Sequence, residues 1–372
     1  MLMEGMPGCG KTHLARTFGE ENFGDVAYFD LSERRTRRAL RRAGESAEAL
    51  VEELSLLRGR GFSAGRTLLV LDGLSQGEGG RLLARLAAVG EVPVLGIASH
   101  PSLGQVGDTS PPCLRGGVSV MRLYPLSFGE FKDAFSSRIR QEREETLFRR
   151  YLRVGGLPGA VSAYLEEESL AAACAVHAAF SSRIPGFLAE GAPPKMFEKL
   201  SAVWQTVPLE LEMGRERFRF ADVRREWRAK DLEDAVAWLV RSGLLYRVPR
   251  VAAPGVWDGR SFSLYPADVG LLSFLLGGGE EGLLTRAAIL GEWKSAGVER
   301  VSSWYSGNMA RVDFLVGEAA VPVLLREGRI RARALSEYRG RFHPSREWTV
   351  SAEEEGGALP PWRVREILED LG

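Results

Sequence analysis

The chain has 372 residues, of which 45% are hydrophobic and 26% charged, and its formal net charge at pH 7 is +0. This is the composition of an ordinary globular protein, and the length suits two or three domains. A balanced charge excludes a general attraction to nucleic acids or acidic membranes, so such binding needs a local basic surface. No apolar run approaches the roughly 18–20 residues of a membrane span. The scattered cysteines, Cys9, Cys113 and Cys174, indicate neither disulfides nor zinc, and we expect a cytoplasmic protein.

The segment Gly5–Thr12 matches the phosphate-binding P-loop, G-x-x-x-x-G-K-[ST], at each fixed position. Its glycines let the backbone turn tightly and direct N–H groups toward phosphate oxygens. Lys11 can reach the β- and γ-phosphates, and the Thr12 hydroxyl can bind the Mg²⁺ that bridges them. The residues expected to bind ATP are Gly5, Pro7, Gly8, Cys9, Gly10, Lys11, Thr12 and His13. Only Met1–Glu4 precede the loop, which is short for a central strand.

Short apolar runs alternate with helical patterns up to about residue 135. We expect strands at 26–31, 67–71, 92–98 and 118–123, and helices at 34–57 and 80–89. This alternation predicts an α/β fold with a parallel sheet covered by helices on both faces. Residues 104–117 are rich in glycine and proline, which is typical of a loop.

Asp72 follows the apolar run Thr67–Leu71. In P-loop proteins, an aspartate at the end of such a buried strand is the Walker B residue, which holds Mg²⁺ beside the P-loop hydroxyl. The alternative is an aspartate that caps a turn before Gly73. We expect Thr12 and Asp72 to hold the metal together.

The remainder of the chain predicts two further regions. Helices are expected at 200–207, 220–226 and 232–242, followed by strands at 243–248 and 261–265, which is the winged-helix pattern. From about residue 280, one helix and strands at 298–305, 310–316 and 321–326 indicate a small α/β domain. The expected division is an ATP-binding core at 1–135, a helical and winged-helix region at 136–275, and the small domain at 276–372.

Four segments after the P-loop resemble the bacterial and archaeal AAA-type ATPases that carry a C-terminal domain of unknown function with a restriction-endonuclease-like core. Residues 122–131 are similar to the family's L-x-P-L-S-F-x-E-F segment, and residues 151–161 to its Y-L-x-x-G-G-x-P helix. Residues 235–245 are similar to the end of its winged helix, and residues 264–272 to L-Y-x-x-D-x-G-L-L. The resemblance covers nearly the whole chain and implies a P-loop core, a winged helix and a nuclease-like domain. The alternative interpretation is that the prolines, glycines and apolar residues of these four segments only form turns and pack in the core.

The resemblance also assigns a role to Ser99 and reveals a departure at Gly73. Ser99 ends the expected strand 92–98, where AAA-type enzymes place a residue that senses the γ-phosphate, although a loop serine is an equal reading. The residue after the Walker B aspartate is normally a glutamate that polarises the attacking water, and here it is Gly73. We therefore expect ATP and Mg²⁺ binding with slow turnover and catalytic roles for Lys11, Asp72 and Ser99. If the surrounding geometry is otherwise complete, Gly73→Glu should raise turnover.

The C-terminal domain lacks the acidic pair of the related nucleases. Asp313 stands in the position of the family's E-V-D-F segment, but Leu324 and Arg326 replace the glutamate and lysine of P-x-E-x-K. Glu292 is a candidate helical acid, yet one aspartate and one distant glutamate make a poor metal site. We expect a scaffold without nuclease activity. The rival interpretation, a DNA-processing enzyme with a linked nuclease, requires an intact acidic pair.

Two groups of arginines are candidates for contact with DNA. The first is Arg34, Arg35, Arg37, Arg38, Arg41 and Arg42, and the second is Arg329, Arg331, Arg333, Arg339 and Arg341. The alternative for the first group is a solvated face balanced by Glu45, Glu48, Glu52 and Glu53. The leading interpretation is a Mg-ATP-dependent switch or slow ATPase with a protein or DNA client, and an oligomer is compatible with it. A nucleotide-binding regulator without turnover is a further alternative.

Overall fold

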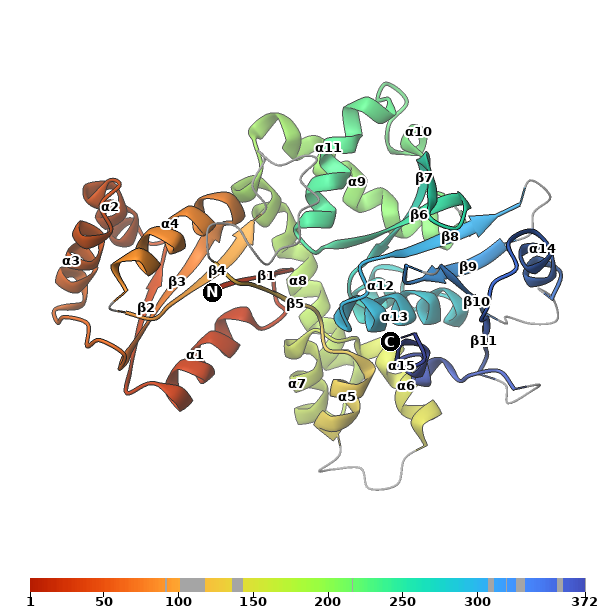
Figure 1. Ribbon diagram of the computed structural model, residues 1–372, viewed down its shortest axis with the longest axis horizontal. Helices are drawn as coiled ribbons and strands as arrows, with labels where there is room; N and C mark the ends of the chain where they lie inside the picture. Colours follow the sequence, from red (N-terminus) through yellow and green to blue (C-terminus); the bar gives the residue numbers. More distant parts are fainter. Residues whose placement is uncertain are drawn as a thin grey trace. The chain divides into compact units, whose positions relative to one another are not determined.

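The computed structural model describes residues 1–90, 92–100, 118–135, 143–215, 217–306, 311–318, 320–325, 332–352 and 357–371 (Figure 1). Contacts group the chain into two compact units. Unit 1 comprises Met1–Leu123, Pro185–Phe197 and Ala237–Gly243, and unit 2 comprises Tyr124–Ile184, Glu198–Val236 and Leu244–Gly372. This grouping into two units does not test the three-domain division expected from the sequence, which stays a prediction. No helix in the described ranges is long and apolar enough to cross a membrane.

Unit 1 is built on a parallel sheet of five strands in the order β2-β3-β4-β1-β5. The strands are β1 (Leu2–Gly5), β2 (Asp25–Asp30), β3 (Thr67–Ser75), β4 (Val94–His100) and β5 (Val120–Leu123), and the helices between them are α1 (Lys11–Asn22), α2 (Arg34–Ala43), α3 (Ala47–Arg58) and α4 (Gln76–Val89). Strand β4 is inserted between β1, which leads into the P-loop, and β3, which carries Asp72. This is the order of AAA-type P-loop ATPases, and the predicted fold class is confirmed.

Alternating residues of the central strands face different helices of unit 1. Leu69 and Leu71 belong to the apolar cluster that contains Leu50 of α3. Their neighbours Leu68 and Val70 pack instead with Ala15 of α1. Because side chains alternate along a strand, α1 covers one face of the sheet while α3 covers the other. The short β1 lies between β4 and β5 and pairs with both.

The prediction of a single helix at 34–57 is wrong, because the structure has two helices there, α2 and α3. Helix α2 ends at Ala43, and Gly44 has a φ of 56°, which a helix cannot contain. Helix α3 then starts from Ser46, whose hydroxyl accepts the Ala49 N–H at 3.1 Å. The apolar spacing continues across this break, and for that reason the pattern alone gave one helix.

Unit 2 contains a mixed sheet of six strands in the order β11-β10-β9-β8-β6-β7. The strands are β6 (Leu245–Ala253), β7 (Val256–Pro266), β8 (Val301–Tyr305), β9 (Arg311–Val316), β10 (Val321–Leu325) and β11 (Trp348–Val350). Strands β6 and β7 form an antiparallel hairpin, and β6 also pairs in parallel with β8 through Arg250 and Val251. The hairpin expected for a winged helix therefore continues the sheet of the C-terminal region.

The remaining helices are α5 (Phe128–Phe135), α6 (Glu144–Val154), α7 (Pro158–Glu167), α8 (Leu170–Gly191), α9 (Pro194–Glu212), α10 (Phe220–Val223), α11 (Ala229–Arg241), α12 (Val269–Leu275), α13 (Glu281–Ser295), α14 (Ala332–Phe342), the 3-10 helix η2 (Pro361–Arg363) and α15 (Glu366–Glu369). Helix α13 packs on the sheet through Trp293, whose ring centroid lies 5.2 Å from that of Phe314. Helix α14 packs through Tyr338 against Trp304, also at 5.2 Å. The helices expected before the hairpin are present as α9, α10 and α11, while their winged-helix assignment stays a prediction.

A buried carboxyl group joins α9 to α10. Glu210 is buried, and its carboxylate accepts the Arg219 N–H at 3.2 Å. Burial, followed by a hydrogen bond with the Asp222 carboxyl group, raises the pKa of Glu210 to about 7. Glu210 therefore carries a proton in the folded protein at pH values where it is ionised in the unfolded chain.

This raised pKa predicts a pH-dependent stability. The contribution of protonated Glu210 is fully present below the pKa of an unfolded glutamate, about 4.3, and is lost as the pH rises through about 7. We expect Glu210→Gln, whose amide imitates the neutral acid, to raise the unfolding temperature by about 2–4 °C at about pH 8 and to leave it nearly unchanged at about pH 4. Circular dichroism melts test this, with Glu212→Gln, an exposed neighbour on α9, as the control. Equal shifts at both pH values would contradict the assignment.

Candidate nucleotide-binding site

The P-loop connects the end of β1 to the start of α1. Gly5, Gly8 and Gly10 have φ angles of 144°, 79° and 91°, which residues with side chains rarely adopt. A Cβ atom at Gly5 would collide with the carbonyl oxygen of Leu123 on β5. The path of the loop thus depends on glycine at the positions where the motif requires it.

Lys11 closes the loop around its own ammonium group. Its Nζ donates to the carbonyl oxygens of Gly5 and Met6, at 2.8 Å each, and lies 3.9 Å from Cys9 Sγ. Lys11 and Cys9 are buried, whereas Gly8 and His13 are exposed. Burial raises the pKa of the Cys9 thiol although the Lys11 charge opposes this, so the thiol is neutral at pH 7. The ammonium charge is therefore fixed within the loop instead of extending into water.

The structure brings Thr12 and Asp72 together. Thr12 Oγ1 donates to Asp72 Oδ2 at 2.7 Å, and the Tyr28 hydroxyl donates to the same oxygen at 2.7 Å. Hydroxyl and carboxylate oxygens are the ligands that Mg²⁺ prefers, and Mg²⁺ usually completes its octahedron with phosphate oxygens and water. The donor set of Thr12 and Asp72 therefore fits a Mg²⁺ ion that arrives with a nucleotide.

Tyr28, on β2, belongs to this site and was not found from the sequence. Burial, followed by the hydrogen bond to Asp72, raises the pKa of its phenol, so the hydroxyl stays a donor. The Arg16 guanidinium lies 4.2 Å from the centroid of the Tyr28 ring. The pairing of β2 with β3, which sets Asp30 opposite Asp72, positions Tyr28. This register is a tertiary property, and no motif signals it.

The chain is irregular after Asp72. Gly73 has a φ of 88°, and the register between β3 and β4 shifts between Asp72 and Leu74. A glutamate at this position would be strained, so Gly73→Glu does not simply restore a water-polarising residue, and we no longer expect it to raise turnover. Ser99 lies on β4, as expected, and its side chain is outside the described part of the structure.

Two of the family-like segments meet inside unit 2. The Leu126 N–H donates to the Gly156 carbonyl oxygen at 2.7 Å, and the Tyr151 hydroxyl donates to the Leu126 carbonyl oxygen at 2.8 Å. A Cβ atom at Gly156 would collide with Leu126. The glycine pair of residues 155–156 is therefore required by close backbone packing.

Asp268 brings a third segment to the same place. Its buried carboxylate accepts the Gly156 N–H at 2.6 Å and the Leu271 N–H, in the first turn of α12, at 2.7 Å. Burial raises the pKa of Asp268, and both of these hydrogen bonds oppose the rise because they favour the ionised form. Asp268 thus holds the turn before α7 and the start of α12 through a single side chain.

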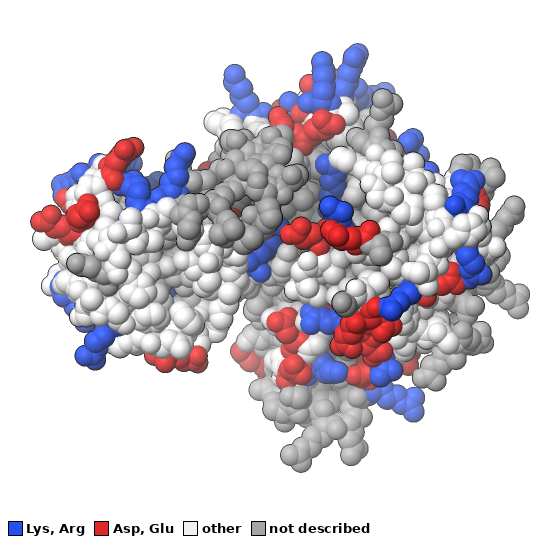
Figure 2. Space-filling model, viewed as in Figure 1, with Lys and Arg blue, Asp and Glu red and all other residues white. Residues whose placement is uncertain are grey.

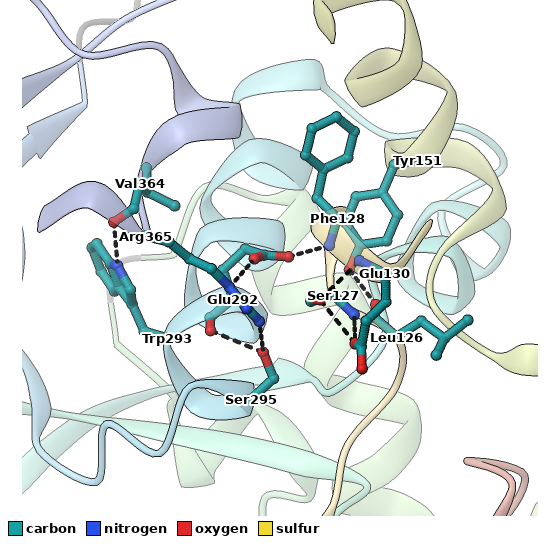
Figure 3. Close-up of polar contacts among 10 residues, drawn as sticks. All are labelled: Leu126, Ser127, Phe128, Glu130, Tyr151, Glu292, Trp293, Ser295, Val364 and Arg365. Atoms are coloured by element: carbon teal, nitrogen blue, oxygen red, sulfur yellow. Dashed lines mark hydrogen bonds and ion pairs between the residues drawn. The ribbon is translucent and has the colours of Figure 1, made fainter. Parts of the chain in front are cut away.

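Glu292 fastens α13 to the start of α5 (Figure 3). Its carboxylate accepts the N–H of Phe128 and pairs with the Arg365 guanidinium at 2.9 Å. The neighbouring Trp293 indole donates to the Val364 carbonyl oxygen at 3.1 Å. Burial raises the pKa of the Glu292 carboxyl group, while Phe128 and Arg365 lower it. Glu292, which the sequence suggested as a possible metal ligand on a helix, instead connects α13 to α5 and to Arg365.

Asp313 is also engaged by protein groups. Its Oδ2 accepts the Leu325 N–H at 3.0 Å, and its Oδ1 lies 3.1 Å from Arg311 Nε. Leu324 is buried, and Arg326 lies outside the described residues. Across the described ranges, no group of three or more His, Cys, Asp and Glu side chains is arranged to hold a metal ion. Asp313 therefore links β9 to β10.

Part of the chain matches a known family model, and several solved structures of ATPases are similar to it. Residues 145–282 match a domain of unknown function, DUF8612. The Walker-type ATPase PABY2304 of Pyrococcus abyssi is 14% identical, with 74% of this chain and 90% of that chain covered and a TM-score of 0.44. The Aeropyrum pernix ORC1 protein in complex with DNA is 15% identical, with 79% and 87% covered and a TM-score of 0.35.

AMPPCP-bound DnaA from Aquifex aeolicus is 14% identical, with 63% of this chain and 80% of that chain covered and a TM-score of 0.30. No curated protein matches the chain. The AAA-type P-loop fold is defined by the strand order of unit 1 and by the position of the P-loop after β1.

Asp268 provides a direct test of the junction in unit 2. Asp268→Ala leaves two buried N–H groups without their acceptor, so we expect the free energy of unfolding to fall by about 2–5 kcal/mol. Urea titration followed by tryptophan fluorescence measures this change. Asp234→Ala, an exposed aspartate on α11, is the control and should change stability by less than about 0.5 kcal/mol. A loss below about 1 kcal/mol for Asp268→Ala would show that other acceptors replace it.

Proposed function

We propose that the protein binds Mg-ATP at the P-loop and acts as an AAA-type ATPase or nucleotide-dependent switch with slow turnover. The observation that carries the proposal is the 2.7 Å hydrogen bond between Thr12 and Asp72. It joins the start of α1 to β3 and unites the two groups that share Mg²⁺ in P-loop proteins. A glycine-dependent loop with a buried lysine at its base supports the same function.

Each residue has a proposed task. Backbone N–H groups from Gly8 to His13, at the positive end of the α1 dipole, bind phosphate oxygens. Lys11 supplies positive charge to the β- and γ-phosphates, and Thr12 and Asp72 hold Mg²⁺. When bound, Mg²⁺ neutralises charge that develops on the phosphates. Tyr28 orients the Asp72 carboxylate through its hydrogen bond. Ser99 is the proposed sensor of the γ-phosphate.

The first test is the removal of the Lys11 charge. We expect Lys11→Ala to weaken Mg-ATP binding at least about 100-fold, which corresponds to about 2.7 kcal/mol, because no other cation lies within the loop. Isothermal titration calorimetry measures the affinity. Lys230→Ala removes an exposed lysine of unit 2 and serves as the control. Undiminished affinity in Lys11→Ala would exclude the P-loop as the nucleotide site.

Turnover distinguishes the ATPase from the regulator. With Gly73 after Asp72, we expect ATP hydrolysis below about 1 s⁻¹, the lower end of the ordinary enzyme range. Phosphate release is measured with Mg²⁺, with and without duplex DNA, and Asp72→Asn is the inactive reference. No release above this reference would favour the regulator without turnover. A faster rate would show that another residue, such as one from a neighbouring subunit, activates the water.

We further propose that the C-terminal region is a scaffold and not a nuclease. The supporting observation is that Asp313 and Glu292, the two acids that a metal site would use, are each engaged by backbone N–H groups and by an arginine. Mg²⁺ would have to displace these partners.

A further inference from the structure

Helix α2 exposes an unusually basic surface. All six of its arginines are exposed, namely Arg34, Arg35, Arg37, Arg38, Arg41 and Arg42. The buried residues of the helix, Thr36, Ala39 and Ala43, form its opposite face. At 3.6 residues per turn, Arg34, Arg38 and Arg41 line the centre of the outward face, and we call these three residues the arginine stripe.

The arginine stripe has no partner among the residues that the structure describes. Arg35 pairs with Glu33 at 2.6 Å, and Arg42 pairs with Glu53 at 3.7 Å. Arg37 donates to a backbone carbonyl oxygen. The sequence left open that glutamates of α3 neutralise the arginines of α2. In the structure this holds for Arg42, which pairs with Glu53, and the arginine stripe stays unpaired among the described residues.

This arrangement opposes helix stability. Like charges at positions i and i+4, such as Arg34 with Arg38, destabilise a helix by about 0.2–0.5 kcal/mol per pair. The first turn contains no acidic residue, and its arginines face the positive end of the helix dipole. A polyanion on the outward face would relieve both effects, whereas water alone leaves them in place.

We propose that the arginine stripe contacts the phosphate backbone of duplex DNA. From Arg34 to Arg41 the helix rises about 10 Å, a length over which one DNA strand presents about three phosphates. Each guanidinium group can donate two parallel hydrogen bonds to the oxygens of one phosphate, so each arginine of the stripe can bind one phosphate group. Contacts of this kind fix the position of a protein on DNA without selecting a sequence.

One further arginine lies near the C-terminal end of α2. Arg85 of α4 donates to the carbonyl oxygen of Gly44, directly after α2. In Figure 2, acidic as well as basic side chains cover this part of unit 1, so the proposal rests on the outward face of α2 and not on a wide basic surface. In the other candidate group, Arg339 and Arg341 pair with Glu347 and Glu337. Arg329 and Arg331, and the side chain of Arg333, lie outside the described part.

The test is DNA binding by the full chain with the three charges removed. Fluorescence anisotropy follows two unrelated labelled duplexes of about 25 base pairs in about 50–200 mM KCl, without nucleotide. For the triple variant Arg34→Gln, Arg38→Gln, Arg41→Gln we expect Kd to rise at least about tenfold for both duplexes. The slope of log K against log salt should fall in magnitude by about 2–3.

A matched control removes three charges elsewhere. Arg149, Arg300 and Arg363 are exposed arginines of unit 2, each paired with a carboxylate, and their triple glutamine variant should bind within about twofold of the wild type. The stripe variant should also melt no lower than the wild type, because repulsion within α2 is removed.

Three results would overturn the proposal: no DNA binding by the wild type at about 50 mM salt, equal losses in both triple variants, or stripe-dependent binding to phosphatidylglycerol vesicles in place of DNA. The proposal does not rest on Mg-ATP binding, since the experiment contains no nucleotide. Failure at the P-loop and failure at the stripe are therefore distinguishable.

Discussion

The carboxylate of Asp268 is the interaction on which the organisation of unit 2 depends. It lies where water cannot reach, and it accepts N–H groups from two segments that are far apart in the chain, at Gly156 and Leu271. A third segment docks on the same turn through Leu126. Because a Cβ atom at Gly155 would collide with Asp268, the glycines and the aspartate form one packing unit. The family-like motifs are thus explained by geometry inside the fold.

The same chemistry recurs at other buried acids of unit 2. Glu292 accepts the first N–H of α5, and Asp313 accepts an N–H of β10. Each of these carboxylates also has an arginine partner, which offsets the free energy of burying its charge. Acids that suggest metal chemistry when read as isolated letters therefore serve here as acceptors for backbone groups that the fold would otherwise leave unsatisfied.

The features that the sequence predicts correctly are those determined by residues close together in the sequence. The P-loop and the apolar strand that leads to Asp72 have local patterns, and both are present in the structure, although β3 includes Asp72 and continues to Ser75. The break at Gly44 was missed because the apolar period continues through it. The place of Tyr28 beside Asp72 and the pairing of β6 with β8 depend on contacts between distant segments, which a single sequence does not record. The left-handed φ of Gly73 accompanies a register shift between β3 and β4, which no local pattern in the sequence records.

The two hydrogen bonds from Lys11 to Gly5 and Met6 have a consequence for nucleotide recognition. They hold the loop in its curved form through bonds within the protein itself, so part of the entropy lost on ordering this loop is met during folding. A flexible loop would meet that loss at the moment of association and would bind more weakly for it. For the proposed nucleotide-binding function, preorganisation of this kind would present the phosphates with a loop that is already shaped, and the fold itself would then contribute to affinity.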